Sequence, residues 1–268
     1  MTAMLEIKNI SKTFNIGTIN EKHALNNLSL TLNDGDFVTV IGGNGAGKST
    51  MLNAVAGVWP IDSGAIVIDG NNVTGLADFQ RANLIGRVFQ DPMMGTAPTM
   101  QIDENLALAR RRGKKRTLRW GVTKKERTEY VEALKTLNLG LEDRLTAKVG
   151  LLSGGQRQAL TLLMASLQKP KLLLLDEHTA ALDPKTAKRV LEITEEIVVR
   201  DHLTAMMVTH NMADAIRIGN RLIMMNEGQI IYDVSGEEKK KLTVEDLLRK
   251  FNELSGEEFA DDKALLSR

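Results

Sequence analysis

One glycine-rich stretch constrains this chain more than any other: Gly42-Gly43-Asn44-Gly45-Ala46-Gly47-Lys48-Ser49, followed by Thr50. A glycine, four residues and then Gly-Lys-Ser is the spacing of a phosphate-binding loop. Residues 37–41 before it read as a buried strand, and residues 49–56 after it have a helical pattern, which is the context such a loop requires. Its backbone N–H groups and the positive end of the helix dipole would point at one anion. The sequence therefore predicts a site for a nucleoside triphosphate.

Two side chains of this stretch predict how the triphosphate is held. Lys48 supplies a cation that reaches the β- and γ-phosphates, and the Ser49 hydroxyl is placed to ligate Mg²⁺, a hard ion that takes oxygen ligands. The alternative is an accidental glycine-rich turn. The correct flanks on both sides argue against that alternative.

Composition limits the remaining function classes. The chain has 268 residues, with 35 Lys and Arg against 34 Asp and Glu, so its formal net charge of +1 gives no general attraction to nucleic acid. It has no cysteine, which excludes disulfides, a thiol nucleophile and cysteine zinc sites. Neither a signal peptide nor a membrane-spanning run of apolar residues is expected, and a cytoplasmic protein is predicted.

The elements before and after the loop predict the fold class. Alternating residues 5–10 and 28–32 predict an antiparallel lobe at the N-terminus, with Phe14 in a turn behind the first of these strands. Helical patterns between residues 100 and 152 predict an all-α insertion. Near the C-terminus, Leu247, Leu248, Phe251 and Leu254 form an apolar stripe typical of a short docked helix.

A basic stretch lies inside the insertion, from Arg110 to Arg116 with Arg119 and Trp120 close behind. We interpret it as a solvated surface, with a place near a membrane surface as the second possibility. Binding to nucleic acid is disfavoured, because the balanced charge and the few aromatic residues (2 Trp, 2 Tyr and 6 Phe) leave no stacking platform.

A second anion site is predicted where the insertion ends. Leu152-Ser153-Gly154-Gly155-Gln156 precedes an apolar helix, so a serine hydroxyl and bare N–H groups again meet at a helix start. Four leucines then form a buried strand that ends in Asp176 and Glu177, and a later apolar strand ends near His210. A buried carboxylate pair needs a cation, which favours Mg²⁺ and a reacting water beside it.

Together these motifs resemble the nucleotide-binding subunits of ATP-binding cassette (ABC) transporters. The motifs stand in that family's order: the phosphate loop at 42–49, Gln90, the Leu-Ser-Gly-Gly-Gln signature at 152–156, Asp176-Glu177, Ala-Leu-Asp at 181–183 and His210. The resemblance covers about residues 4–235. It implies an α/β fold: a P-loop NTPase core with a mostly parallel sheet, an N-terminal antiparallel β lobe and an inserted all-α subdomain.

The resemblance also implies boundaries and the residues that hold ATP. We expect a cassette domain at 1–240, with its helical subdomain at about 91–152, and a C-terminal helical extension at 241–268. Phe14 would stack on adenine, and Ser49, Gln90 and Asp176 would surround Mg²⁺. The phosphates would contact Gly42, Gly43, Asn44, Gly45, Ala46, Gly47, Lys48, Ser49 and Thr50.

For hydrolysis, the resemblance implies that Glu177 polarises the attacking water, that His210 contacts the γ-phosphate and that Lys48 assists. Two copies would pack head to tail, with Asp183 linking the halves. The signature residues of one copy would cover the ATP that is bound to the other copy. These residues are Ser153, Gly154, Gly155 and Gln156. The family usually has proline after the catalytic glutamate, where this chain has His178.

The resemblance further implies a permease partner and a place on the inner face of the cell membrane. A single cassette without membrane helices favours an importer of small solutes that works with a solute-binding protein, without nucleic acid. The alternatives are an exporter and a soluble ABC ATPase that is not coupled to transport. The solute itself contacts other subunits and is not encoded here.

Overall fold

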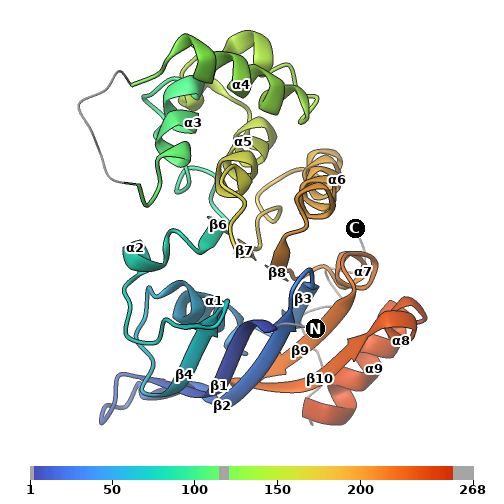
Figure 1. The fold of residues 1–268 in the computed structure, drawn as a ribbon. Helices are drawn as coiled ribbons and strands as arrows, with labels where there is room; N and C mark the ends of the chain where they lie inside the picture. The colour runs from blue at the N-terminus through green and yellow to red at the C-terminus, as the bar shows by residue number, and fades with distance from the viewer. Residues whose placement is uncertain (1–2, 115–120, 256–268) are drawn as a thin grey trace. The chain divides into compact units, whose positions relative to one another are not determined.

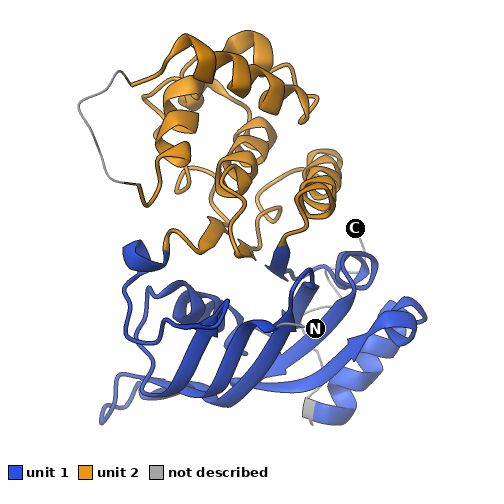
Figure 2. Cartoon of the chain, in the orientation of Figure 1, with its two compact units in different colours: residues 1–81, 204–268 blue, residues 82–203 orange. Residues whose placement is uncertain are grey.

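A computed structural model describes residues 3–114 and 121–255 of the chain. The chain forms two compact units, residues 1–81 with 204–268 as unit 1 and residues 82–203 as unit 2 (Figure 2). Unit 2 includes the segment 91–152 for which helices are predicted, together with the two strands and two helices that flank it.

The first sheet of unit 1 is antiparallel, with the strand order β2-β1-β4-β5 (Figure 1). Its strands are β1 (Ala3–Phe14), β2 (Lys22–Asn33), β4 (Ser63–Ile68) and β5 (Asn71–Asn72). Ile7 lies opposite Leu30 on β2 and Ile66 on β4, and all three side chains are buried. The predicted antiparallel N-terminal lobe is confirmed.

The second group of strands in unit 1 carries the phosphate loop. Strand β3 (Phe37–Gly42) pairs in parallel with β8 (Thr204–Val208) and β9 (Arg221–Asn226), and β10 (Gln229–Ser235) pairs antiparallel with β9. Residues 37–41 are all buried, as expected for a parallel strand that is apolar on both faces. The helices of the unit are α1 (Lys48–Ala56), α2 (Asp78–Arg81), α7 (Met212–Arg217), α8 (Gly236–Lys240) and α9 (Val244–Ser255).

A buried arginine holds the far end of α1, the helix that follows the phosphate loop. Arg81 is 2% exposed, and its Nη1 donates to the carbonyl oxygens of Ala54 at 2.9 Å and Val55 at 2.7 Å. A cation at a helix C-terminus satisfies unpaired carbonyl groups and complements the negative end of the dipole. Arg81 therefore fixes α1 at the end opposite to the glycine-rich loop.

Helix α9 packs on unit 1 through its apolar stripe. Leu247 and Phe251 join a buried cluster that includes Ile41 and Met224, and Leu248 is packed against the same cluster. Leu254, the fourth member of the predicted stripe, is 48% exposed, because it lies beyond the edge of that cluster. Residues 256–268 of the predicted extension lie outside the described residues.

Unit 2 joins two parallel strands, β6 (Ile85–Val88) and β7 (Leu172–Asp176), to a group of helices. Its helices are α3 (Ile102–Arg110), α4 (Lys124–Lys135), the 3-10 turns Glu142–Arg144 and Val149–Leu151, α5 (Gly154–Ser166) and α6 (Pro184–Asp201). The four leucines of β7 are fully buried. Among the described residues, no helix has the length and apolar character that crossing a membrane requires.

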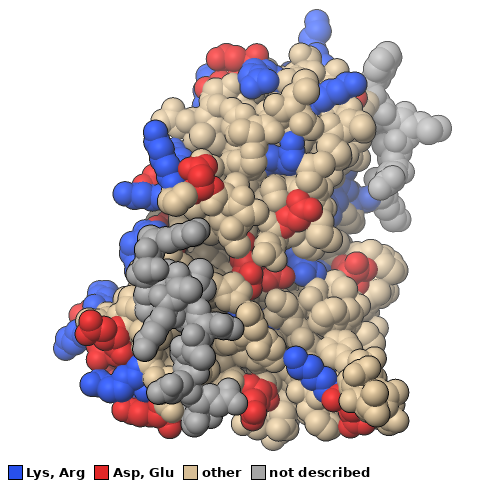
Figure 3. Space-filling view, turned by 180° about the vertical axis from the view of Figure 1, so that it is seen from behind, with Lys and Arg blue, Asp and Glu red and all other residues tan. Residues whose placement is uncertain are grey.

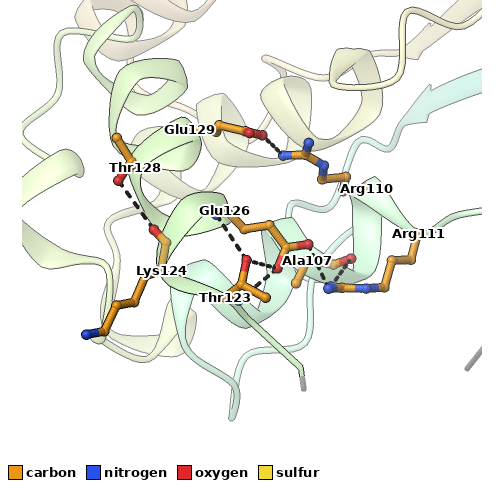
Figure 4. A network of polar contacts seen from close by, with 8 residues as sticks. All are labelled: Ala107, Arg110, Arg111, Thr123, Lys124, Glu126, Thr128 and Glu129. Carbon is orange, nitrogen blue, oxygen red and sulfur yellow. Dashed lines mark hydrogen bonds and ion pairs between the residues drawn. The ribbon is translucent and has the colours of Figure 1, made fainter. Parts of the chain in front are cut away.

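The three arginines that open the basic stretch make polar contacts within unit 2, and the side chains of Arg110 and Arg111 stay partly exposed, which agrees with their interpretation as a solvated surface. Arg110 pairs with Glu129, and Arg111 pairs with Glu126 at 2.7 Å, so both arginines connect α3 to α4 (Figure 4). Arg112 Nη2 donates to the carbonyl of Ala165 on α5 at 3.3 Å, and burial lowers the pKa of Arg112. Residues 115–120 of the stretch lie outside the described residues.

The surface charges are mixed. On the face drawn in Figure 3, acidic and basic side chains of the described residues are interspersed. This distribution agrees with the near-zero net charge of the whole chain.

The docking of α9 can be tested with a pair of substitutions. Phe251→Ala removes a ring that is 4% exposed, so the free energy of unfolding should fall by about 3 kcal/mol, the usual cost of an aromatic cavity. Leu254→Ala is the control, because its side chain is half exposed and should cost about 0.5 kcal/mol or less. Urea unfolding of both variants measures the difference. Equal losses would mean that α9 does not pack through Phe251.

Candidate nucleotide-binding and hydrolysis site

The phosphate loop packs its backbone directly against neighbouring strands of unit 1. A Cβ on Gly42, which has φ 150°, would lie 2.2 Å from the carbonyl oxygen of Met225 on β9. A Cβ on Gly47, with φ 98°, would lie 2.5 Å from the carbonyl oxygen of Ala24 on β2. Both positions therefore require glycine. Gly47 is the N-cap residue of α1, and no side chain caps the start of this helix.

Lys48 lies beneath the loop. Its side chain is 5% exposed, and its ammonium donates to the carbonyl oxygens of Gly42 at 2.7 Å and Gly43 at 3.0 Å. These bonds hold a buried cation against the carbonyl groups at the start of the loop.

Two residues that the sequence analysis did not single out lie against the loop. Gly228, in the turn between β9 and β10, donates its N–H to Ala46 O at 3.0 Å, and its own carbonyl accepts from Asn26 N at 3.1 Å. The Lys22 ammonium lies 2.9 Å from where a Cβ on Gly45 would be. The dipeptide Glu227-Gly228 between two apolar runs signals a hairpin turn, but nothing in the sequence says that the turn reaches the phosphate loop.

Phe14 is the last residue of β1 and pairs with Lys22 on β2. The strand therefore continues through position 14, and the prediction of a turn at this position was wrong. Its ring meets Trp59 edge to face, with centroids 5.0 Å apart and planes at 80°. The Lys12 ammonium lies 5.5 Å from the same ring centroid. These contacts fix the ring that the sequence analysis expects to stack on adenine. His210, also in unit 1, follows β8 by two residues.

Unit 2 carries the signature helix. Ser153 caps α5: its hydroxyl accepts from Gln156 N at 3.3 Å, and Gln156 Oε1 accepts from Ser153 N at 3.2 Å. A Cβ on Gly155 would lie 2.1 Å from Thr186 Cγ2, so only glycine permits this approach of α5 to α6. The result is a second, rigid helix N-terminus with glycine N–H groups, as the sequence predicted.

Arg87 on β6 is a charged neighbour of Asp176 that the sequence reasoning missed. Its Nη2 lies 3.7 Å from Asp176 Oδ2, and its guanidinium carbon lies 4.5 Å from the centre of the Phe89 ring. The carboxylates at the end of β7 were expected to lie beside a cation, and Mg²⁺ was the only cation predicted there. Arg87 supplies part of the positive charge expected there, because its guanidinium balances the charge of the Asp176 carboxylate.

Glu177 occupies a left-handed conformation, with φ 45°, which is unfavourable for a residue with a side chain. Its carbonyl accepts from Ala180 N at 2.9 Å, which closes a turn directly behind β7. Asp183 then caps α6 by accepting from Thr186 N at 3.1 Å, and this hydrogen bonding lowers the pKa of Asp183. The loop from 177 to 183 is therefore held at both ends by regular elements.

His178 is buried in the same loop, with 2% exposure. Its Nε2 lies 3.0 Å from Thr194 Oγ1 on α6. Burial lowers the pKa of His178 to about 4, so the ring is neutral at pH 7.

The residues expected around Mg²⁺ fit that ion by their chemistry. Ser49 offers a hydroxyl in unit 1, and Gln90 and Asp176 offer an amide and a carboxylate oxygen in unit 2. Mg²⁺ prefers few protein oxygens and completes its shell with water and phosphate. Among the described residues there is no cluster of three or more His, Cys, Asp or Glu, so a metal cage made by the protein alone is not indicated.

The family model described as ABC transporter matches residues 25–180. The chain belongs to the ABC transporter family. The tyrosine transport ATP-binding protein of Clostridioides difficile (strain R20291) is 47% identical to this ABC chain over 92% of the chain and 98% of the relative. The spermidine/putrescine import ATP-binding protein of Haemophilus ducreyi is 34% identical, over 93% of this chain but 64% of its own length.

Solved structures agree with this membership. A dimeric, post-hydrolysis ATP-binding cassette bound to ADP and Pi has a TM-score of 0.73 at 30% identity, covering 87% of this chain and 98% of that one. The ABC chain is thus an ATP-binding subunit with ATPase activity and an α/β P-loop fold. The family match includes the phosphate loop, Gln90, the signature and Glu177, whereas Asp183 and His210 lie beyond it.

The neutral state of His178 predicts how stability depends on pH. Between pH values of about 4 and 6.5, the unfolded chain binds a proton at this histidine that the folded chain does not, so the free energy of unfolding rises with pH in this window. The contribution is complete above pH 6.5, is lost on acidification towards pH 4 and amounts to about 3 kcal/mol at most. Urea unfolding of the parent and of His178→Gln at pH 4.5 and 7 should give a smaller pH effect in the variant. An equal pH effect would contradict a buried neutral ring.

Proposed function

We propose that two copies of this ABC ATPase hydrolyse Mg-ATP to drive uptake of a small solute through a membrane permease. The observation that carries the proposal is the presence of two glycine-bearing helix N-termini in one chain, at Lys48 and at Gly154. Each helix N-terminus is suited to bind an anion. One triphosphate requires one such site that binds its phosphates and a second that closes over them. Two copies placed head to tail supply both to each ATP, and the dimeric ATP-binding cassette of similar fold supports this arrangement.

Nucleotide binding follows from the geometry of the loop. The N–H groups between Gly42 and Thr50 would surround the phosphates, and Phe14 would stack on the adenine ring. The ammonium of Lys48 would exchange its bonds to Gly42 O and Gly43 O for bonds to phosphate oxygens. The ammonium of Lys48 loses its hydration when the protein folds, because it is buried in the folded chain. Its desolvation therefore does not oppose ATP binding.

Hydrolysis requires a base and charge stabilisation. Ser49, Gln90 and Asp176 would hold Mg²⁺, which when bound neutralises negative charge on the phosphates. Glu177 would orient and partly deprotonate the attacking water, and His210 would contact the γ-phosphate. Ser153, Gly154, Gly155 and Gln156 of the second copy would close the site, and Asp183 would link the two copies.

Glu177→Gln tests the proposed base. The change preserves size but removes the negative charge, so ATP turnover should slow by about 100-fold or more while ATP binding survives. Phosphate release and ATP affinity measure the two effects. Turnover at the parental rate would remove Glu177 from the proposed reaction.

Trapping of the dimer tests the head-to-tail arrangement. With Mg-ATP, uncleaved nucleotide should hold Glu177→Gln as a dimer in size-exclusion chromatography with light scattering. Lys48→Ala should bind ATP weakly and stay monomeric, because the phosphates lose their cation. A Glu177→Gln variant that is inactive, binds ATP and stays monomeric at high protein concentration would contradict the sandwich.

Import is proposed because the spermidine/putrescine relative is named an import protein and because the closer relative is named for tyrosine transport. An aromatic amino acid is therefore the first solute to test, with a solute-binding protein delivering it. In this arrangement the ABC ATPase lies on the inner face of the cell membrane.

The permease is proposed to contact Met93 and Met94, which are 42% and 68% exposed beside Gln90. Flexible thioether side chains adapt to an apolar helix. Changing both methionines to aspartate should abolish copurification with the permease. The matched control changes Leu108 and Val199, which are 49% and 71% exposed, to aspartate and should leave the complex intact. Equal assembly of both variants would place the contact elsewhere.

A further inference from the structure

A side chain in the interior of the loop behind β7 connects this loop to α6. The turn closed by Glu177 O and Ala180 N fixes the backbone locally, and Asp183 fixes the end of the loop on α6. Between these points, the His178 ring reaches Thr194, which lies in the second half of α6 and is 0% exposed. A hydrogen bond to a long helix transmits the position of that helix to the loop.

The direction of this hydrogen bond follows from its neighbours. The Thr194 hydroxyl donates to Val190 O at 2.8 Å, so its proton is already engaged. The hydroxyl therefore accepts from His178, whose Nε2 carries the proton. This hydrogen bond fixes the tautomer of the ring, with the proton on Nε2.

The backbone beside His178 needs such an anchor. Glu177 lies in the left-handed region, which costs of the order of 1–3 kcal/mol for a residue with a side chain and persists only where the surroundings enforce it. β7 fixes the residue before it, and the bond to Thr194 fixes the residue after it. The conformation of Glu177 decides where its carboxylate points.

We propose that His178 is a positioning residue, which, through its hydrogen bond to Thr194, holds Glu177 in the orientation required for hydrolysis. This inference rests on the proposed role of Glu177. Proline, which the family usually has at this position, has no side-chain donor and could not make this bond. This way of positioning the glutamate therefore requires a histidine at position 178 and a hydrogen-bond acceptor on the facing helix.

Thr194→Val is the sharpest test, because it keeps the shape of the side chain and removes the hydroxyl that contacts both His178 and Val190 O. We expect kcat for ATP to fall by about tenfold, since a displaced catalytic group loses rate steeply with small errors in geometry, while KM and the affinity for ATP stay within about twofold. Thr194→Ser keeps the hydroxyl and should restore the rate. His178→Gln, whose amide can donate to Thr194, should retain more activity than His178→Leu.

Thr161→Val on α5 is the matched control. Thr161 is 2% exposed, and its hydroxyl donates to Arg157 O four residues earlier at 2.9 Å, as Thr194 does within α6, but no histidine donates to it. Both valine variants lose the same kind of helix hydrogen bond. The melting temperature of Thr194→Val should fall further, because this change also leaves the buried His178 N–H without its acceptor. At a temperature where both variants are folded, only Thr194→Val should lose kcat. Equal kcat values in the two variants would overturn the proposal.

A double-mutant cycle separates positioning from general damage. If Thr194→Val acts through Glu177, its effect on single-turnover hydrolysis should disappear when Glu177 is already glutamine. A tenfold loss that persists in the Glu177→Gln background would overturn the inference but leave the proposed base intact. Parental turnover of Glu177→Gln alone would instead overturn the proposed function on which the inference rests.

Discussion

The close approach of the phosphate loop to its neighbouring strands is the constraint on which unit 1 depends. Gly42 and Gly47 bring the loop's backbone within reach of carbonyl groups on β9 and β2, and a Cβ at either position would collide with them. The same contact determines the direction of the N–H groups at the start of α1. The packing of the loop against β9 and β2 therefore contributes both to the fold of unit 1 and to the shape of the proposed anion site.

Three buried cations in unit 1 donate to the same kind of acceptor, the backbone carbonyl group. Lys48, Arg81 and Lys239 are 5%, 2% and 1% exposed, and each donates to backbone carbonyl oxygens. Carbonyl partners compensate the desolvation of a cation without adding a negative charge. For Arg81 and Lys239 this arrangement holds structural segments in place. For Lys48 it places the ammonium against the first two carbonyl groups of the phosphate loop.

The sequence predicted those features whose residue types are dictated by local geometry. Glycine spacing located both helix N-termini, and the four leucines before Asp176 located β7, because backbone form and burial decide those residues directly. Tertiary partners were beyond such reasoning. Arg87 is an ordinary residue of a short strand until β6 pairs with β7, and the basic stretch shows its ion pairs only when α3 lies beside α4. Local patterns contain no information about which helix faces an arginine.

His178 illustrates where a family pattern stops being informative. Proline at this position would stiffen the loop through its own ring, by restricting φ without any partner. Histidine leaves the local backbone free and obtains restraint from a distant residue, Thr194, sixteen positions along the chain. The two solutions differ in kind, since a proline acts on the loop alone whereas the histidine couples the loop to α6. That helix is capped by Asp183, the residue expected to link the two copies, so restraint of Glu177 and contact between copies would share one rigid element.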